Sequence, residues 1–152
     1  MDQLIHAAPR PVILCLSQAG MELARKLADA LDGDIHGHAV RCPDAPHHFG
    51  RARQHIADLF CSGRPVIGIC AAGILIRAVA PHLNHKSVDA PVISVAESGR
   101  VVVPLIGGHH GAIVLARKVS EAIDADLSGD LSADELTWAL REMGLGATNE
   151  TV

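Results

Sequence analysis

Short runs typical of buried strands alternate with amphipathic helical patterns along most of this 152-residue chain. The clearest run is P-V-I-G-I-C at 65–70, which has no charged residue and is rich in β-branched side chains. It leads through A-A-G into the helical pattern I-L-I-R-A-V-A-P. Because strands that alternate with helices build parallel sheets covered on both sides, we predict a three-layer α/β/α fold with a mostly parallel sheet.

The remaining elements fit the same plan. The patterns predict strands at 11–17, 34–40, 90–96 and 100–106 and helices at 21–31, 51–60 and 112–123. The last two strands are separated by E-S-G, which predicts one β-hairpin in the sheet. We expect the Pro-rich stretch R-C-P-D-A-P-H-H-F-G to form a loop.

Composition narrows the class of partner. The net charge is −4 and aromatic residues make up only 2% of the chain, so we expect neither nucleic acid nor an anionic membrane as a partner. No window approaches a membrane span, and the N-terminus does not resemble a signal peptide. The cysteines are scattered without a CxxC motif, which favours free thiols in a reducing cytoplasm; they are Cys15, Cys42, Cys61 and Cys70.

Two expected strand-to-helix turns are rich in glycine: C-A-A-G-I-L-I-R at 70–77 and L-I-G-G-H-H-G-A at 105–112. In open α/β sheets such turns lie beyond the carboxyl ends of strands, where ligands bind, and helix N-termini attract anions. We therefore predict one shallow site for a carboxylate or phosphate ligand, with the candidate residues Ala72, Gly73, Arg77, Gly107, Gly108 and Gly111. The alternative is that these glycines serve only tight turns and packing. Neither turn is a Walker loop or a GxGxxG motif, so no nucleotide cofactor is expected.

Three blocks of sequence carry a resemblance to a known family. They are A-A-G-I-L-I-R-A-V-A-P, then D-A-P-V-I-S-V-A-E-S-G-R-V-V-V-P-L-I, then G-G-H-H-G-A. Over about 11–119 they resemble the N-terminal domain of the CbiG family of cobalamin biosynthesis, the cobalt-precorrin-5A hydrolases. A similar domain is fused to precorrin-3B C17-methyltransferase, and this sequence resembles that version most. The resemblance implies a corrin-pathway domain over 1–123 that binds a cobalt-precorrin-type tetrapyrrole.

The family's reaction opens a ring lactone and releases a two-carbon aldehyde. The resemblance therefore implies a base, for which His109 and His110 are the candidates, and oxyanion donors, for which the Gly108 and Gly111 N–H groups are the candidates. The alternative is that the histidines contact the ligand or cap the helix without chemistry. This chain has Ala112-Ile113-Val114 where the family has G-A-N, and a T-T-A-x-D-like segment is absent. We expect hydrolysis to require further domains, with other cobalamin-pathway enzymes or a second copy of the chain as protein partners.

The stretch D-A-D-L-S-G-D-L-S-A-D-E at 124–135 resembles a single EF-hand loop. Its calcium ligands would be Asp124, Asp126, Ser128, Asp130, Ser132 and Glu135. This predicts a second unit over 124–152, consisting of the loop, a helix and a flexible tail. The alternative function is thus a calcium-binding module with the α/β body as its scaffold. A simpler interpretation is a helix start, with Ser132 as its cap and Glu135 as the capping-box partner.

Overall fold

The computed structural model describes residues 9–85, 88–108 and 111–127. The strands within these ranges are β1 (Val12–Cys15), β2 (Asp34–His38), β3 (His47–Phe49), β4 (Val66–Ile69), β5 (Val92–Val95), β6 (Val101–Ile106) and β7 (Asp126–Leu127). The α-helices are α1 (Met21–Leu31), α2 (Ala52–Cys61), α3 (Ala72–Val79) and α4 (Ala112–Ile123), with short 3-10 turns at η2 (Gln18–Gly20) and η3 (Ala80–His82).

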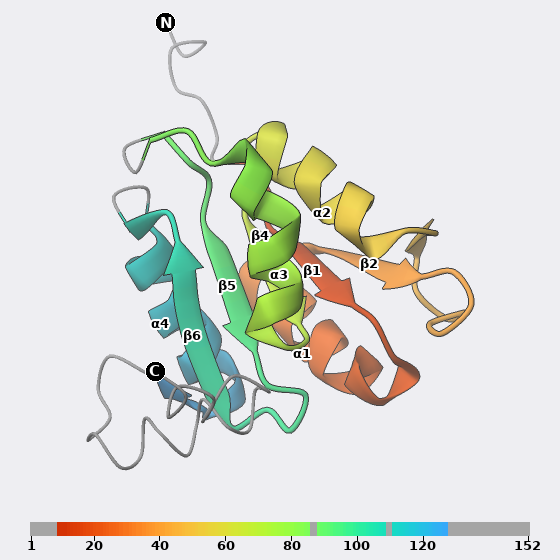
Figure 1. Cartoon of the computed structure of the whole chain (residues 1–152). Helices are drawn as coiled ribbons and strands as arrows, with labels where there is room; N and C mark the ends of the chain where they lie inside the picture. The colour runs from red at the N-terminus through yellow and green to blue at the C-terminus, as the bar shows by residue number, and fades with distance from the viewer. Residues whose placement is uncertain (1–8, 86–87, 109–110, 128–152) are drawn as a thin grey trace, which may run out of the picture.

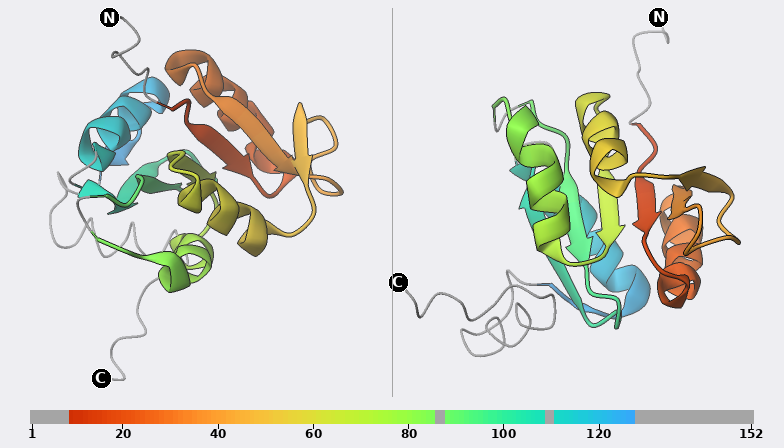
Figure 2. Two further views of the ribbon diagram at one scale, coloured as in Figure 1. Left: turned by 90° about the horizontal axis from the view of Figure 1, so that it is seen from above. Right: turned by 45° about the vertical axis from the view of Figure 1, so that its right-hand side comes forward.

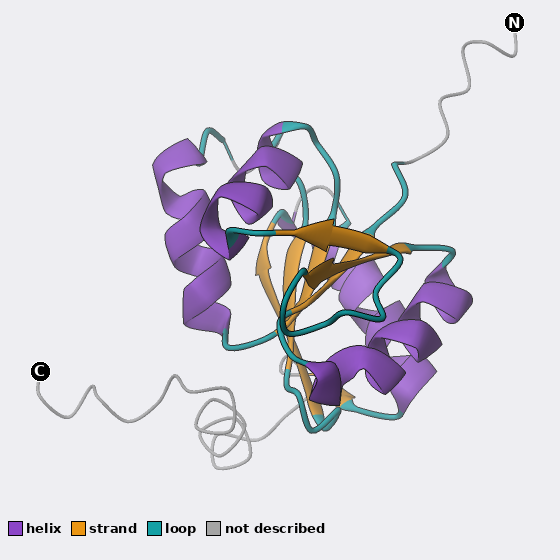
Figure 3. Ribbon diagram, turned by 90° about the vertical axis from the view of Figure 1, so that its right-hand side faces the viewer, coloured by secondary structure: helices purple, strands orange, loops and turns teal. Residues whose placement is uncertain are grey.

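In this part of the chain the strands form one seven-stranded sheet in the order β3-β2-β1-β4-β5-β6-β7 (Figure 1). Helices α1 and α4 cover one face, and α2 and α3 cover the other, so the sheet is the middle layer of three (Figures 2 and 3). This arrangement confirms the predicted α/β/α fold.

Successive side chains of the central strands point to opposite faces of the sheet, so the core is divided into two halves. Ile13 and Ile67 point toward α1 and α4, while their neighbours Val12 and Val66 point toward α2 and α3. All four of these side chains are completely buried. Burial of each stabilises the fold by about 1.5–3 kcal/mol, which explains why strands covered on both faces carry no polar alternation.

The hairpin is also confirmed, because β6 runs antiparallel to β5 while the other pairs are parallel. Val95 pairs with Val102 near the turn, and Val92 pairs with Ile106 at the far end. The carboxyl end of β6 therefore lies beside the amino end of β5. This reversal decides where the second glycine-rich turn is placed.

Two edge strands were not predicted. The stretch expected to be a loop contains β3, in which His47 pairs with His36 and Phe49 pairs with His38. Strand β7 adds to the other edge, where Leu127 pairs with Val102. Both strands are too short, at three and two residues, to produce a periodic pattern in the sequence.

The cysteines have the character that the sequence predicts. All four are free, and Cys15 and Cys42 are buried. Burial raises the pKa of Cys15 and that of Cys70 to about 12, so both behave as small apolar side chains. Among the helices of the described ranges, none is long and apolar enough to cross a lipid bilayer.

Candidate functional site

The two glycine-rich turns lie at opposite ends of the sheet, so the expectation of one shared site is wrong. Ala72 and Gly73 begin α3 just beyond the carboxyl end of β4. Gly107 follows the antiparallel strand β6 and lies beside Pro91, which precedes β5. A Cβ atom at Gly107 would approach the Pro91 Cα to 2.7 Å. The hairpin reverses the chain and so carries the second turn to the amino end of the parallel strands.

The turn at the carboxyl end is formed mostly by backbone. Ala72 is fully buried, Gly73 is partly buried, and the N-cap residue Ala71 provides no side-chain hydrogen bond to α3. Arg77 is exposed in the last turn of this helix, away from the amides at its start. Its backbone carbonyl accepts a long hydrogen bond of 3.5 Å from the Arg53 guanidinium. Arg77 is therefore not placed to hold an anion at the start of α3.

A polar contact that the sequence did not reveal lies at the same carboxyl end. The Ser17 hydroxyl donates a hydrogen bond to the Glu97 carboxylate and joins the loops that follow β1 and β5. The Ser94 hydroxyl donates to the Cys70 carbonyl at 2.9 Å, which ties β5 to the end of β4. The partners in the first contact are 80 positions apart, and no local pattern connects them.

The turn at the amino end shows which glycines the fold itself requires. Gly107 and Gly111 have φ angles of 89° and 88°, a region that favours glycine. The Gly107 carbonyl accepts from the Ala112 N–H at 3.1 Å, which closes the turn. Gly108 differs from both, because its φ is not in this region and a Cβ atom there would meet no described residue within 4 Å. His109 and His110, between Gly108 and Gly111, lie outside the described residues.

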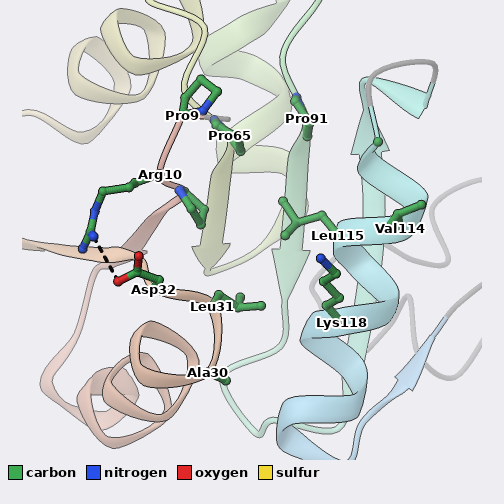
Figure 4. Close-up of a pocket in the computed structure, with 12 residues that line it drawn as sticks. Pro9, Arg10, Ala30, Leu31, Asp32, Pro65, Pro91, Val114, Leu115 and Lys118 are labelled. Atoms are coloured by element: carbon green, nitrogen blue, oxygen red, sulfur yellow. Dashed lines mark hydrogen bonds and ion pairs between the residues drawn. The ribbon is translucent and has the colours of Figure 1, made fainter. Parts of the chain in front are cut away.

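Two grooves flank this turn. One, with a volume of about 630 Å³, lies between the end of α1 and the first half of α4 (Figure 4). Its lining includes Gly111. The other, of about 470 Å³, is bordered by Leu83, Leu105, Gly107 and Gly108. The amino end of the sheet thus offers concave surface on both sides of the Gly107–Gly111 turn.

A row of prolines lines the first groove. Pro11, Pro65 and Pro91 each immediately precede a strand, and Val12, Val66 and Val92 that follow them are in register. Each proline carbonyl accepts a backbone hydrogen bond of 2.9–3.0 Å from a neighbouring strand. Because proline has no N–H group, this row offers a ligand almost no polar atoms. The sequence did carry this feature, since a proline directly precedes the first valine of each of the three strands.

The two cationic side chains beside this groove, Arg10 and Lys118, differ in whether they are already paired with the carboxylate of a described residue. Arg10 forms ion pairs with Asp32 at 3.0 Å and with Asp34 at 2.9 Å. Hydrogen bonds from Arg10 and from Arg64 lower the pKa of Asp34 to about 2. Lys118, on α4, points into the groove and takes part in no ion pair with a described residue (Figure 4). Lys118 is therefore the cation that a bound anion could reach.

Comparison with known sequences identifies the family. The model of a family described as Cobalamin synthesis G N-terminal matches residues 54–143. The chain belongs to this family. The match extends beyond 119 and includes the acidic stretch at 124–135. The division of the chain into units over 1–123 and 124–152 stays a prediction.

Two hydrolases are among the relatives of this Cobalamin synthesis G N-terminal domain. It is 34% identical over 77 residues to the cobalt-precorrin-5A hydrolase of Priestia megaterium, covering 50% of this chain and 21% of the relative. It is 29% identical over 123 residues to the cobalt-precorrin-5A hydrolase of Salmonella typhimurium, covering 80% and 33%. The chain thus spans about a third or less of the length of these relatives. Fusion to a methyltransferase stays a prediction.

The fold of the domain has a counterpart in a solved structure. A crystal structure described as that of a cobalamin biosynthesis protein G homolog from Sulfolobus solfataricus matches with a TM-score of 0.58 and 19% identity. The match covers 78% of this chain and 35% of that one. At this identity the likeness supports the fold alone.

The first positions of the acidic stretch adopt regular structure in this domain. Asp124 ends α4 in a left-handed conformation with φ 56°, and Asp126 is an exposed residue of β7. Leu127, the next residue, is buried in the core beneath α4. The predicted ligands Ser128, Asp130, Ser132 and Glu135 lie outside the described residues. Across the part of the chain that the structure describes, no group of three or more His, Cys, Asp or Glu side chains could hold a metal ion.

Proposed function

We propose that this domain binds a cobalt-precorrin-type tetrapyrrole at the amino end of its sheet, as one part of a lactone-opening hydrolase. The family is one of cobalamin synthesis, and both relatives named above are cobalt-precorrin-5A hydrolases. Precursors of the corrin ring carry acetate and propionate groups around the macrocycle. Such a ligand needs a broad concave surface with at least one cation, and the grooves beside Gly107–Gly111 provide that surface, with Lys118 as the cation.

Gly108 is the observation that carries this proposal. The other two described glycines of the turn are explained by their positive φ angles, and Gly107 also by its contact with Pro91. Gly108 has open space at its Cα and borders a groove. A glycine in that position lets a ligand approach the backbone closely, as in other turns that bind anionic groups.

Within this site we propose that His109 or His110 activates water for attack on the lactone, while the Gly108 and Gly111 N–H groups stabilise the oxyanion. The alternative role is contact with the ligand without chemistry. Ala72, Gly73 and Arg77 lie on the carboxyl-end side or on the outer face of α3. We therefore propose only Ala72 and Gly73, at the start of α3, as a second, separate site for an acidic group of the ligand, and Arg77, in the last turn of that helix, is not part of it.

Ligand binding can be tested with dicyanocobyrinic acid, a stable corrin whose rim carries free carboxylates. We expect Gly108→Val to weaken its binding at least about tenfold in equilibrium dialysis, because the side chain occupies space needed by the ligand. Gly50→Val is the matched control, since Gly50 is also exposed with nothing near its Cα. Unchanged binding in Gly108→Val would place the ligand elsewhere, and Gly73→Ala then tests the turn of α3.

The two roles of the histidines can be separated in a hydrolase that joins this domain to the further domains expected for hydrolysis, by measuring release of the two-carbon aldehyde together with corrin binding. If a histidine is the base, its replacement by Gln abolishes aldehyde release while binding stays within about threefold of the wild type. If it only contacts the ligand, binding and release fall together. Aldehyde release that is unaffected by both His109→Gln and His110→Gln excludes both residues from the chemistry.

Calcium binding by 124–135 is the second candidate function. One observation favours it: α4 ends at Ile123, so a helix does precede Asp124 as in an EF-hand. Titration with calcium should then change the fluorescence of Trp138, and Glu135→Gln should abolish the change. A calcium titration without any response rejects this function and leaves the tetrapyrrole proposal unaffected.

A further inference from the structure

We propose that the proline-lined groove holds one methylene-linked acid arm of the ligand and that Lys118 pairs with its carboxylate. This inference rests on the proposed function and assigns a specificity-determining residue to it. The lining of the groove includes Gly111, at the edge of the proposed site. The groove lies between α1 and α4 (Figure 4). An arm of a macrocycle lying over the turn could therefore enter it.

The walls of the groove favour an apolar arm of the ligand. The rings of Pro11, Pro65 and Pro91 carry no donor, and their carbonyls already accept hydrogen bonds within the sheet. Leu31 and Leu115 add aliphatic surface from the two helices. A polar segment here would lose its hydrogen bonds to water without replacement, whereas methylene groups lose none.

The charged side chains beside the groove then indicate which group ends the methylene arm of the ligand. Asp32 and Asp34 engage both terminal nitrogens of Arg10, so Arg10 is already neutralised where it borders the groove. Lys118 lies on the opposite wall, exposed and without an ion-pair partner among the described residues. A single ammonium suits a carboxylate, while a phosphate would favour several converging donors. An apolar arm that ends in one carboxylate therefore fits both features.

The test compares dicyanocobyrinic acid with its fully methylated ester, using equilibrium dialysis at low ionic strength with the full chain. We expect Lys118→Met to weaken binding of the acid about fivefold, the range of a solvent-accessible ion pair. Binding of the ester should not change, because it lacks the charge. Lys118→Arg should restore most of the affinity, and Lys26→Met, an exposed lysine of α1 that does not line the groove, should bind as the wild type does.

The outcomes separate this inference from the proposed function. If the wild type binds the acid and Lys118→Met binds it equally well, Lys118 has no role and the proposed function stands. Equal loss of affinity for acid and ester also overturns the inference, since it would show a packing effect rather than a charge effect. If the wild type binds neither corrin, the proposed function itself is wrong.

Discussion

Ile106, the last residue of β6, pairs with Val92, the first residue of β5. This pairing places the following turn against the segment that enters β5, where Gly107 meets the Pro91 backbone. Because β6 runs against its neighbour, the turn after it shares an end of the sheet with the proline row rather than with the start of α3. The candidate site is therefore defined by the direction of a single strand.

Gly107→Ala should destabilise the protein substantially. Its φ of 89° is strained for alanine, and the new Cβ would lie 2.7 Å from the Pro91 Cα, which cannot move without shifting β5. We expect a loss of about 2–4 kcal/mol in the free energy of unfolding, measured by urea denaturation. Gly108→Ala is the control and should change it by less than about 0.5 kcal/mol. Equal stability of the two variants would contradict the described turn.

Much of the fold could be predicted because its strands are buried on both faces. Runs such as Val12–Cys15 and Val66–Ile69 show that burial directly, and E-S-G marks the hairpin between β5 and β6. The site could not be placed by the same reasoning. A glycine-rich turn shows where a helix begins but not at which end of the sheet, so joining the two turns into one site ignored the reversal that the hairpin itself implied.

Contacts between segments that are distant in the sequence could not be predicted from the sequence either. The Ser17–Glu97 hydrogen bond depends on β1 and β5 both flanking β4, an order fixed by packing rather than by any motif. The proline row is different, because a proline directly before the first valine of three strands can be read from the sequence itself. Recognising that parallel strands begin at one edge would have brought these prolines together in advance.

The thiols should differ sharply in reactivity. Cys61 is exposed, Cys15 and Cys42 are buried, and burial holds the pKa of Cys70 at about 12. Since the thiolate is the reactive form, we expect Ellman's reagent to modify Cys61 rapidly at pH 8 and the others only on unfolding. Cys61→Ser should remove the fast phase. A fast phase that survives in Cys61→Ser would show that a second thiol opens to solvent.

Asp34 should contribute to stability through its two arginine partners. Its carboxylate accepts from Arg10 at 2.9 Å and from Arg64 at 2.7 Å, which lowers its pKa to about 2. Asp34→Asn should cost about 1 kcal/mol at neutral pH, measured by urea denaturation. Because the folded-state pKa is depressed, this contribution is fully present above the unfolded value and is lost as the pH falls through about 2. Asp29→Asn, at an exposed position on α1, should have almost no effect.

Three histidines from β2, β3 and α2 form a cluster at the edge of the sheet formed by β3 and β2. The His36 Nδ1 and His55 Nε2 atoms are 2.8 Å apart, so one ring donates a hydrogen bond to the other. The His36 and His47 ring centroids are 5.2 Å apart, and Phe49 stacks on His55 at 4.8 Å. Two protonated rings could not keep this arrangement, because neither would retain an acceptor nitrogen.

This cluster should make the protein less stable in mild acid. Burial lowers the pKa of His36 to about 4, and the nearby His55, His47 and Arg64 add to this effect while Asp34 opposes it. Burial also lowers the pKa of His55. Both rings therefore bind a proton less readily in the folded state than in the unfolded chain, where their pKa is about 6.5. The unfolded chain therefore takes up protons first, and stability is lost as the pH falls from about 6.5 toward 4.

The melting temperature of His36→Gln, followed between pH 7.5 and 4.5, measures this effect. The variant should lose less of its melting temperature across this range than the wild type, because it no longer carries the group with the largest pKa depression in the cluster. His82→Gln removes an exposed histidine of η3 instead and should keep the wild-type slope. The same slope in all three proteins would mean that the acid sensitivity comes from groups other than this cluster, and that His36 accepts a proton as readily in the folded chain as in the unfolded one.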